Sequence, residues 1–357
     1  MTSTAARTAA FPAALEPLAE QVEQRIDVLL AIEIERWESV DPALVDPLHS
    51  LRDFVAAGGK RLRPAFCACA FVGAGGAIDD PAVIDAAAAL ELVHTFALVH
   101  DDIMDGSDFR RGRDAVHRRF ARQHEDASWR GPARRFGDGM AILVGDFALV
   151  YADILLRGAP ADAQAIFDEL RVELCVGQSL DLVGTATART DAATARRIAT
   201  YKSGKYTVER PLHLGAALAG RNGELAESLS AIGLPMGEAF QLRDDVLGAF
   251  GESSVTGKPV GDDLREGKPT PLVAIATARA TEHDRELLQQ LGSAELTAGD
   301  VAALQAVFVR TGAVDDVEAE IERLVVEARE ALAAAPLDET ACVWLDELAA
   351  YVAWRDS

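Results

Sequence analysis

Two groups of aspartates have the composition and spacing of a site for magnesium and diphosphate. The first is Asp101-Asp102-Ile103-Met104-Asp105, and the second contains Asp244 and Asp245. Each group ends an apolar segment with helical patterning, and an i,i+4 pair such as Asp101 and Asp105 shares one face of a helix. Like charges on one face repel unless a cation holds them, and Mg²⁺ prefers carboxylate oxygens and is commonly shared with substrate phosphates. Two such groups facing each other predict a cage for metal-bound diphosphate.

Cationic side chains that could bind phosphate occur in short polar strings. Arg110 and Arg111 follow the first aspartate group, and a guanidinium fork suits bidentate contacts with diphosphate. Five of the 35 basic residues are lysines, and they lie in the strings GGKRLRP, YKSGKY, TGKP and EGKP. Lysine offers a compact, mobile ammonium that arginine does not copy, so at least three of these five are predicted to face a ligand. The lysines are Lys60, Lys202, Lys205, Lys258 and Lys268.

Helices are predicted to position these side chains, because the chain is rich in Ala, Leu, Glu and Arg and shows no convincing strand alternation. Residues 82–104 are apolar nearly all round, as in a central helix of a bundle, so the first aspartate group ends a core helix. Loops are expected at 126–137 and 251–268. Helical patterns cover 11–57 (broken near Pro42 and Pro47), 60–73, 82–104, 138–156, 161–186, 191–219, 224–250, 269–292, 297–312, 315–334 and 337–352.

Composition narrows the class of protein. The net charge of −22 argues against a nucleic-acid partner, which would require a basic face. No apolar run is expected to reach the roughly 18 residues of a membrane span, and no charged-then-apolar signal pattern is recognised. A cytoplasmic protein is therefore predicted. Residues 1–10 are expected to be disordered, and residues 11–357 are expected to form a single all-α domain, since no linker divides them.

Five motifs in order, from about residue 55 to residue 270, resemble the trans-isoprenyl diphosphate synthase (polyprenyl synthetase) family, most of all its geranylgeranyl diphosphate synthases. They are GGKRLRP, DDIMD with RRG downstream, YKSG, FQLRDD and GK…DDLREGK. The resemblance implies an isoprenoid synthase bundle of about ten or more helices around a central apolar cavity. It also implies a homodimer that condenses isopentenyl diphosphate with an allylic diphosphate, using about three Mg²⁺ per active site.

The resemblance further implies roles for single residues. Asp101 and Asp105 would bind Mg²⁺ on the allylic diphosphate with support from Asp102, and Asp244 would bind another from the opposite side with Asp245 nearby. Gln241 and Ser203 would face the reacting carbons. The allylic diphosphate would contact Arg110, Lys202 and Lys258, with Lys268 as a further substrate-binding lysine, and isopentenyl diphosphate would contact Lys60, Arg63, His94, Arg111 and Arg355.

Product length is predicted from the helix that precedes Asp101. Phe96 and Ala97 lie about one turn deeper, where the family places the floor of the pocket for the growing chain. One aromatic five residues before the motif is typical of a C20 product, so geranylgeranyl diphosphate is predicted, with a farnesyl or longer product as the alternative. Phe96→Ala would then lengthen the product. The competing interpretation is that Phe96 is an ordinary core side chain.

Gly248 departs from the family pattern, which usually has a third Asp at that position of the second motif. Weaker support for the metal is expected, and a weakly active regulatory subunit of a heteromeric synthase is the alternative. A terpene cyclase would not need the Lys60–Arg63 site for a second diphosphate. An HD-type phosphohydrolase would use His100-Asp101 as a metal-binding pair but would leave the lysine and arginine strings unexplained.

Overall fold

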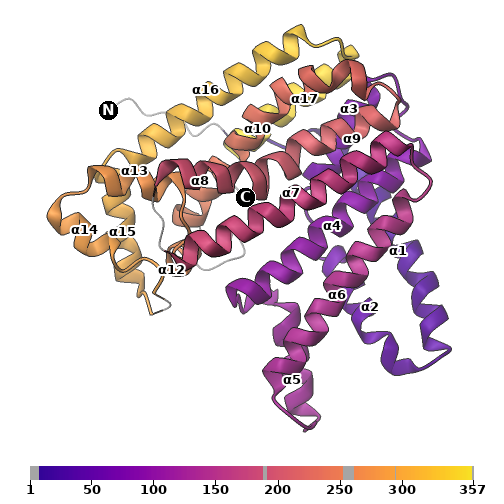
Figure 1. Cartoon of the computed structure of the whole chain (residues 1–357), viewed down its shortest axis with the longest axis horizontal. Helices are drawn as coiled ribbons and strands as arrows, with labels where there is room; N and C mark the ends of the chain where they lie inside the picture. Colours follow the sequence, from indigo (N-terminus) through magenta and orange to yellow (C-terminus); the bar gives the residue numbers. More distant parts are fainter. Residues whose placement is uncertain (1–7, 188–190, 252–260, 294, 356–357) are drawn as a thin grey trace.

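The computed structural model describes residues 8–187, 191–251, 261–293 and 295–355, and it confirms the predicted all-α bundle (Figure 1). Within these residues the strands are limited to one antiparallel pair, β1 and β2, of two residues each. The elements are η1 (Ala13–Leu15), α1 (Glu16–Glu38), η2 (Pro42–Leu44), α2 (Asp46–Ala56), α3 (Leu62–Gly73), α4 (Pro81–Asp105), β1 (Phe109–Arg110), β2 (Arg113–Asp114), α5 (Val116–Asp126), α6 (Ala133–Leu156), α7 (Ala161–Ala186), α8 (Ala192–Ile198), η3 (Ala199–Glu209), α9 (Arg210–Leu218), α10 (Asn222–Phe250), α12 (Asp262–Glu266), α13 (Pro271–Arg279), α14 (Glu282–Leu288), α15 (Ala298–Arg310), α16 (Ala313–Ala334) and α17 (Glu339–Trp354).

Several predicted boundaries were wrong. The single helix expected at 191–219 consists of α8, the π-helical segment η3 and α9, because the wider turns of η3 leave no distinct hydrophobic period in the sequence. The helix expected at 269–292 is divided into α13 and α14, where Thr281 and Asp284 form a capping box that starts a new helix. The loop predicted at 126–137 is shorter, since α6 already begins at Ala133.

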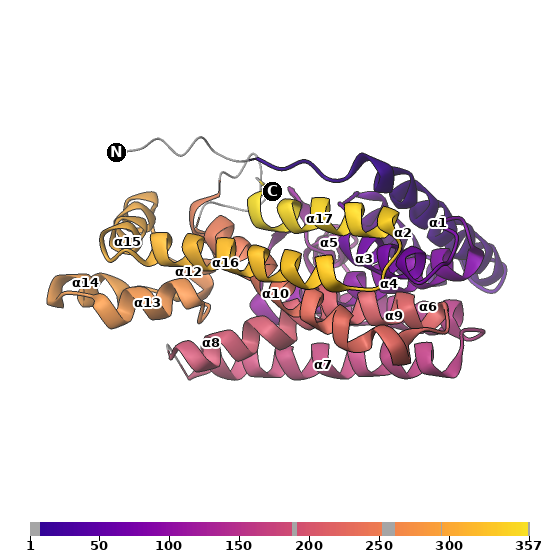
Figure 2. The same ribbon diagram turned by 90° about the horizontal axis from the view of Figure 1, so that it is seen from above.

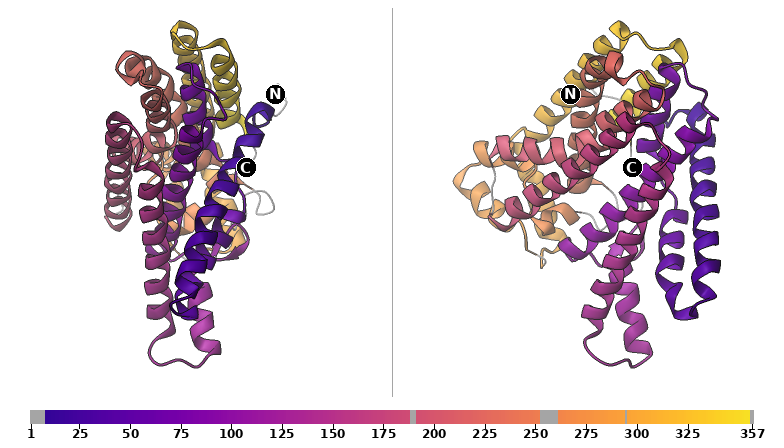
Figure 3. Two further views of the ribbon diagram at one scale, coloured as in Figure 1. Left: turned by 90° about the vertical axis from the view of Figure 1, so that its right-hand side faces the viewer. Right: turned by 45° about the vertical axis from the view of Figure 1, so that its right-hand side comes forward.

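The helices are arranged in layers that enclose α4 and α10. In Figure 2, α7 and α8 form one outer layer and α16 and α17 lie on the opposite side, with α10 between them. The hairpin of α5 and α6 extends beyond the rest of the bundle, as both views in Figure 3 show. Residues 1–7 of the predicted disordered segment lie outside the described residues. In the described part of this segment, residues 8–10, the Ala9 N–H donates a hydrogen bond to the Trp354 carbonyl (3.2 Å).

The predicted central helix is confirmed. Helix α4 packs against α6, α3, α1 and α9, and the run Ala86–Val93 is buried on every face. A helix that is apolar all round can bury each of its faces only inside a bundle. Asp101 lies near the C-terminal end of this central helix and is therefore held in the interior of the bundle.

Two described helices, α4 and α6, are long and apolar enough to cross a membrane by length and composition. Charged residues such as Glu91 in α4 and Asp146 in α6 interrupt both helices, so no uninterrupted apolar run in either reaches 18 residues. Core helices of bundles satisfy the same criterion, and 61% of the most apolar window of α4 is buried inside the structure, against 44% for α6. The two helices also pack against each other.

A close crossing of η3 and α10 positions the residues of both segments. A Cβ atom at Gly237 would lie 2.6 Å from the Gly204 carbonyl oxygen and 2.7 Å from the Gly204 Cα. The two backbones can approach this closely only because residue 237 is a glycine. A Cβ at this position would meet backbone atoms of Gly204, which cannot move away as the end of a flexible side chain could. The crossing brings η3, which carries Lys202 and Ser203, against α10, which carries Gln241, and all three side chains line one cavity.

Replacing Gly237 by Ala is expected to lower the free energy of unfolding by about 1–3 kcal/mol, the usual cost of overpacking a tight interface. The matched control is Gly223→Ala in the same helix, where a Cβ meets no atom within 4 Å. That change is expected to alter the free energy by less than about 1 kcal/mol. Urea midpoints of the two variants measure the difference, and equal midpoints would contradict the role of the crossing.

Candidate functional site

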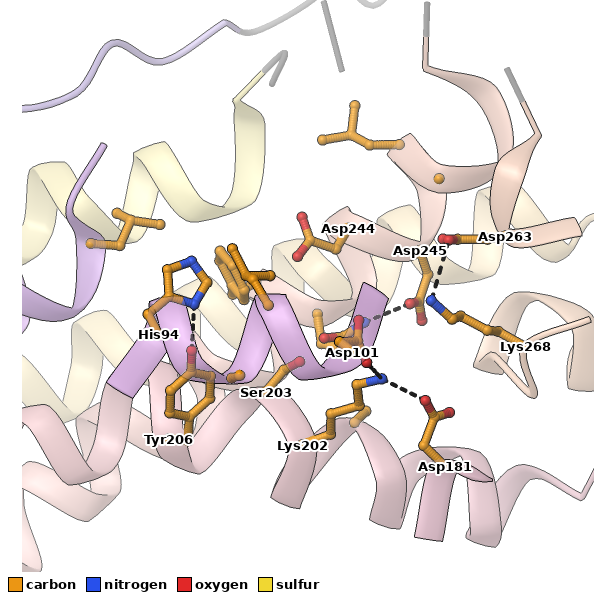
Figure 4. A pocket seen from close by; sticks show the side chains of 18 of the residues that line it. His94, Asp101, Asp181, Lys202, Ser203, Tyr206, Asp244, Asp245, Asp263 and Lys268 are labelled. Carbon is orange, nitrogen blue, oxygen red and sulfur yellow. Dashed lines mark hydrogen bonds and ion pairs between the residues drawn. The ribbon is translucent and has the colours of Figure 1, made fainter. Parts of the chain in front are cut away.

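A cavity of about 770 Å³ opens between the start of α3, the C-terminal halves of α4 and α10, the middle of α7, η3, and the end of α17. Figure 4 shows carboxylates and lysines gathered on one side of it and His94 with Tyr206 on the other. The two aspartate groups, which are far apart in the sequence, therefore meet at one cavity. Its apolar wall includes Ala97, Leu98 and Ile198.

Asp101 is held by two neighbours on different elements. Its carboxylate accepts hydrogen bonds from Lys202 Nζ of η3 (3.1 Å) and from Gln178 Nε2 of α7 (2.9 Å). Lys202 Nζ also lies 2.5 Å from Asp181. Burial favours the protonated acid, but the charges of Lys202 and Lys268 outweigh burial and lower the pKa of Asp101 to about 2. Asp101 is therefore ionised at neutral pH and available to a cation.

Asp105 lies one turn further along α4 and faces Lys268 instead. The Lys268 Nζ is 3.2 Å from Asp105 and 2.5 Å from Glu266. Burial is the main cause that raises the pKa of Asp105, to about 6. Asp105 is not among the described residues that line the cavity, although Lys268 is.

Asp102 points away from the predicted metal site. Its side chain is 1% exposed, and it accepts a hydrogen bond from Arg110 Nε at 2.8 Å. Asp102 is not among the described residues that line the cavity, whereas Arg110 is. An i,i+1 neighbour of Asp101 does not share its helix face. In this structure Asp102 orients the Arg110 guanidinium, and its place among the metal ligands stays a prediction.

Arg355, which follows the last helix α17, fixes the position of the second aspartate group. Arg355 forms an ion pair with Asp244, donates to the Val352 carbonyl (2.7 Å) and lies 4.2 Å above the Phe240 ring. Asp245 is buried and accepts a hydrogen bond from Gln241 Nε2 (2.7 Å). Burial is the main cause that raises the pKa of Asp245 well above its usual range. Asp244 is thus the more exposed carboxylate of this group.

The predicted isopentenyl diphosphate residues Lys60, Arg63, His94 and Arg111 all line the cavity, and so do Ser203 and Gln241. Arg355 also lines it but pairs with Asp244, on the side of the aspartates. Lys258 lies outside the described residues. The predicted substrate contacts therefore come together, except that Arg355 belongs to the second aspartate group.

Buried polar contacts fix the geometry around His94. Its Nδ1 is hydrogen-bonded to the Tyr206 hydroxyl (2.6 Å), and the Arg63 guanidinium lies 4.1 Å above the Tyr206 ring. Arg63 also donates to the Thr207 hydroxyl (2.8 Å). Burial and the positive charges of Arg63 and Arg111 lower the pKa of His94 well below 6.5. His94 is thus a neutral hydrogen-bonding group beside fixed cations.

The imidazole of His94 is therefore expected to stay neutral from about pH 7.5 down to pH 6. As the pH falls through about 6.5, the unfolded chain takes up a proton at this position and the native chain does not. The contribution of His94 to stability therefore falls as the pH decreases through 6.5 and is nearly constant at higher pH. NMR titration of the labelled imidazole measures this, with His94→Gln identifying the resonance. A titration midpoint near 6.5 would contradict it.

Several polar side chains of the cavity lie outside the motifs that predict phosphate or metal binding. Gln178 and Asp181 of α7 face the cavity with Leu174, at the i, i+4, i+7 spacing of one helix face. The spacing of Gln178 and Asp181 on one face of a long helix was the sequence signal that could have identified them as cavity residues. Arg61 is buried in a left-handed conformation (φ 51°) and pairs with Glu91 of α4. A lone glutamate within the apolar run of α4 was the signal for this pair.

The predicted floor residues lie on different sides of α4. Ala97 lines the cavity, whereas Phe96 is not among the described lining residues. The Phe96 ring lies edge-on to His100, with centroids 4.7 Å apart, and His100 Nε2 is hydrogen-bonded to the Ile142 carbonyl of α6 (3.0 Å). Phe96 thus packs on His100 beside the α4–α6 contact, and its role as the floor of the growing-chain pocket stays a prediction. His100 also faces away from Asp101, which disfavours an HD-type metal pair.

The donor set fits Mg²⁺ shared with a diphosphate. The carboxylates of Asp101 and Asp244 lie at the cavity, with Lys202 and Arg355 beside them. No three His, Cys, Asp or Glu side chains of the described chain are close enough together to hold a metal by themselves. That is the arrangement expected of Mg²⁺, which is usually bound by one or two carboxylates, several waters and substrate phosphates.

Comparison with known proteins agrees with this geometry. Residues 47–308 match the model of the polyprenyl synthetase family. The chain is 33% identical over 292 residues to the geranylfarnesyl diphosphate synthase of Aeropyrum pernix, covering 79% of this chain and 85% of that protein. It is 34% identical over 288 residues to the geranylgeranyl diphosphate synthase of Methanosarcina mazei, covering 79% and 81%.

A solved structure is similar over nearly the whole fold. The geranylgeranyl pyrophosphate synthase of Corynebacterium glutamicum, complexed with isoprenyl diphosphate and magnesium, superposes with a TM-score of 0.91 at 35% identity, covering 96% of this chain and 99% of that one. The match of the family model, the helical bundle and the paired aspartate groups at one cavity lead to the same conclusion: this chain belongs to the polyprenyl synthetase family.

Proposed function

We propose that this protein, a prenyltransferase of the polyprenyl synthetase family, condenses isopentenyl diphosphate with an allylic diphosphate, releasing diphosphate. The observation that carries the proposal is that one cavity holds two separate sets of phosphate-binding groups. Asp101, Asp244 and Lys202 lie on one side. Arg63 lies over the ring of Tyr206, which is hydrogen-bonded to His94, and Arg111 is close enough to His94 to lower its pKa. With Lys60, which also lines the cavity, these cations suit a second diphosphate that a terpene cyclase would not need.

The residues have complementary roles in this reaction. Mg²⁺, when bound by Asp101, Asp105 and Asp244, would supply Lewis-acid neutralisation of the diphosphate charge. Lys202 and Arg110 donate hydrogen bonds to the leaving diphosphate, where negative charge develops as the carbon–oxygen bond breaks. Arg63, Arg111 and Lys60 hold the second diphosphate.

The walls of the cavity protect the carbon chemistry. Leu98, Ala97 and Ile198 exclude water from the allylic cation. Ser203 and Gln241 are placed at the reacting carbons in this proposal, between the two sets of phosphate-binding groups. No side-chain nucleophile is needed, since the alkene of isopentenyl diphosphate attacks the cation and the released diphosphate accepts the proton.

A C20 product is the finer part of the proposal. Its support is the small Ala97 beside Asp101, which leaves room for a tail longer than C15, and the relatives named geranylgeranyl and geranylfarnesyl diphosphate synthases. Incubation of the protein with MgCl₂, isopentenyl diphosphate and dimethylallyl, geranyl or farnesyl diphosphate tests both parts. A C20 product is expected, and failure to elongate any primer would contradict the proposal and favour the regulatory-subunit alternative.

The cytoplasmic location stays a prediction from the sequence, and a homodimer is also proposed. Its support is a set of exposed apolar side chains on α6 and α7, which the single chain leaves in contact with water. Sedimentation velocity is expected to give the mass of two chains, and Val150→Asp is expected to shift the equilibrium toward one chain. The exposed side chains are Ile142, Leu143, Val150, Val172, Val176, Leu182 and Val183.

A further inference from the structure

The position of the missing third aspartate is filled by a carboxylate from another element. Gly248 lies one turn after Asp244 on α10, in the same i,i+4 relation that Asp105 has to Asp101. A Cβ atom built on Gly248 would lie 1.8 Å from Asp263 Oδ2 and 2.6 Å from Asp263 Cγ. The carboxylate of Asp263 thus already occupies the space into which a side chain at residue 248 would extend.

Asp263 faces the same cavity as the rest of the second aspartate group. It lines the cavity together with Asp244 and Asp245, and its side chain is 20% exposed. Figure 4 shows it beside Asp245 and Lys268. Its negative charge is the largest electrostatic contribution that raises the pKa of Lys268, and it also helps to raise the pKa of Asp245. Asp263 therefore interacts electrostatically with the same side chains as the second aspartate group.

Close contacts at both ends fix the short helix α12 that carries Asp263. Gly261 precedes it with φ 73°, and a Cβ there would lie 2.6 Å from Val301 Cγ1 of α15. Gly267 follows it with φ 69°, and a Cβ there would lie 2.7 Å from the Gly292 Cα. The Gly292 N–H also donates to the Leu264 carbonyl (2.9 Å). Contacts at both ends hold Asp263 over Gly248.

We propose that Asp263 supplies the third carboxylate of the second aspartate group, and that Gly248 is the cradle that admits it. In the proposed enzyme Asp263 acts with Asp244 on the Mg²⁺–diphosphate, as an aspartate at residue 248 would. The inference rests on the proposed function for its ligand. It also removes the reason to interpret Gly248 as a sign of an inactive subunit.

The competing role for Asp263 is that of a structural counter-ion for Lys268. The distances favour the proposal, because Lys268 Nζ lies 2.5 Å from Glu266 and 3.2 Å from Asp105 but 3.9 Å from Asp263. Although Asp263 contributes most to the raised pKa of Lys268, this lysine would keep its two nearer carboxylates if Asp263 turned to the metal. A structural role would show itself as lost stability rather than as a specific loss of Mg²⁺-dependent binding.

Exchanging the two positions tests the proposal. Binding of inorganic diphosphate is measured by titration calorimetry, with and without MgCl₂, for Asp263→Asn, Asp263→Ala, Gly248→Asp and the double variant Gly248→Asp/Asp263→Ala. The two substitutions of Asp263 are expected to weaken Mg²⁺-dependent binding by about 10–100-fold. Gly248→Asp alone places two carboxylates in one space and is expected to lower both binding and the thermal unfolding temperature.

The double variant is expected to recover Mg²⁺-dependent binding to within about threefold of the wild type, a difference of less than 1 kcal/mol. Asp263→Asn keeps the shape of the side chain, so it reports the loss of charge even if Gly248→Asp fails to fold. Wild-type affinity in Asp263→Asn, or a double variant that binds no better than Asp263→Ala, would overturn the inference.

The binding assay separates this inference from the proposed function. If the wild-type protein elongates prenyl chains but the exchange does not restore diphosphate binding, the role of Asp263 is wrong and the function stands. If the exchange restores binding but no primer is elongated by the wild type, the carboxylate role stands and the proposed reaction is wrong. Thermal unfolding of all variants without MgCl₂ supplies the folding control.

Discussion

Replacing Asp101 by Asn is expected to lower kcat/KM for chain elongation by about 10²–10³-fold, the usual cost of removing one preorganised charge-stabilising group from an active site. Asp101 holds Lys202 Nζ at 3.1 Å and faces the cavity with an ionised carboxylate. Asn keeps the size of the side chain and a hydrogen-bond acceptor for Lys202, so the loss reports the missing charge. The concentration of MgCl₂ needed for half-maximal rate is expected to rise together with the fall in kcat.

The matched control is Asp85→Asn, which removes another aspartate from the same helix. Asp85 pairs with Arg25 of α1 (2.6 Å), and both side chains are about one third exposed. Partly exposed pairs contribute about 0–1 kcal/mol, so rates within about twofold of the wild type are expected. Steady-state kinetics over a range of MgCl₂ concentrations measure both variants. Equal losses in the two variants would mean that Asp101 acts through folding alone.

Replacing Ala97 by Phe is expected to shorten the main product by at least one isoprene unit. Ala97 lines the cavity and lies one helical turn before Asp101, so an aromatic ring there would fill the space that the growing tail needs. Chromatography and mass spectrometry of the dephosphorylated products measure the distribution of chain lengths. A distribution identical to that of the wild type would place the growing chain elsewhere in the cavity.

The companion variant is Phe96→Ala, for which the sequence predicted a longer product. The structure changes this expectation, since the Phe96 ring packs on His100 beside α6. Unchanged chain lengths are now expected, with a loss of stability below the ~3–5 kcal/mol typical of a fully buried Phe. A longer product from Phe96→Ala, together with no effect of Ala97→Phe, would restore the original assignment.

The chemistry of this protein was largely predictable from local patterns. The i,i+4 spacing of Asp101 and Asp105 and the apolar run before them are properties of one helix, and the confirmed central position of α4 follows from them. The helical fold class likewise depends on short-range periodicity. Helix boundaries were less predictable, because the π-helical turns of η3 and the capping box at Thr281 interrupt a pattern that looks continuous in sequence.

Contacts between distant segments decided the rest. Asp102, predicted beside the metal, turns to Arg110, and Phe96 turns to α6, because each helical position faces whichever neighbour the packing places there. Arg355 reaches Asp244 across 111 positions of the chain. No spacing rule within one helix can report such pairs, since they depend on how the helices cross.

By itself, then, the sequence of this protein determined the helical bundle, its family and many of the polar side chains that line the cavity, because spacing along single helices and short motifs carry that information. Only the tertiary structure decided which carboxylates share the cavity. Gly248 is the clearest case: in the sequence it is a gap in the second aspartate group, and in the fold it is the space that Asp263 enters. The reason is physical, since a short-range pattern constrains one element and an active site is assembled from several.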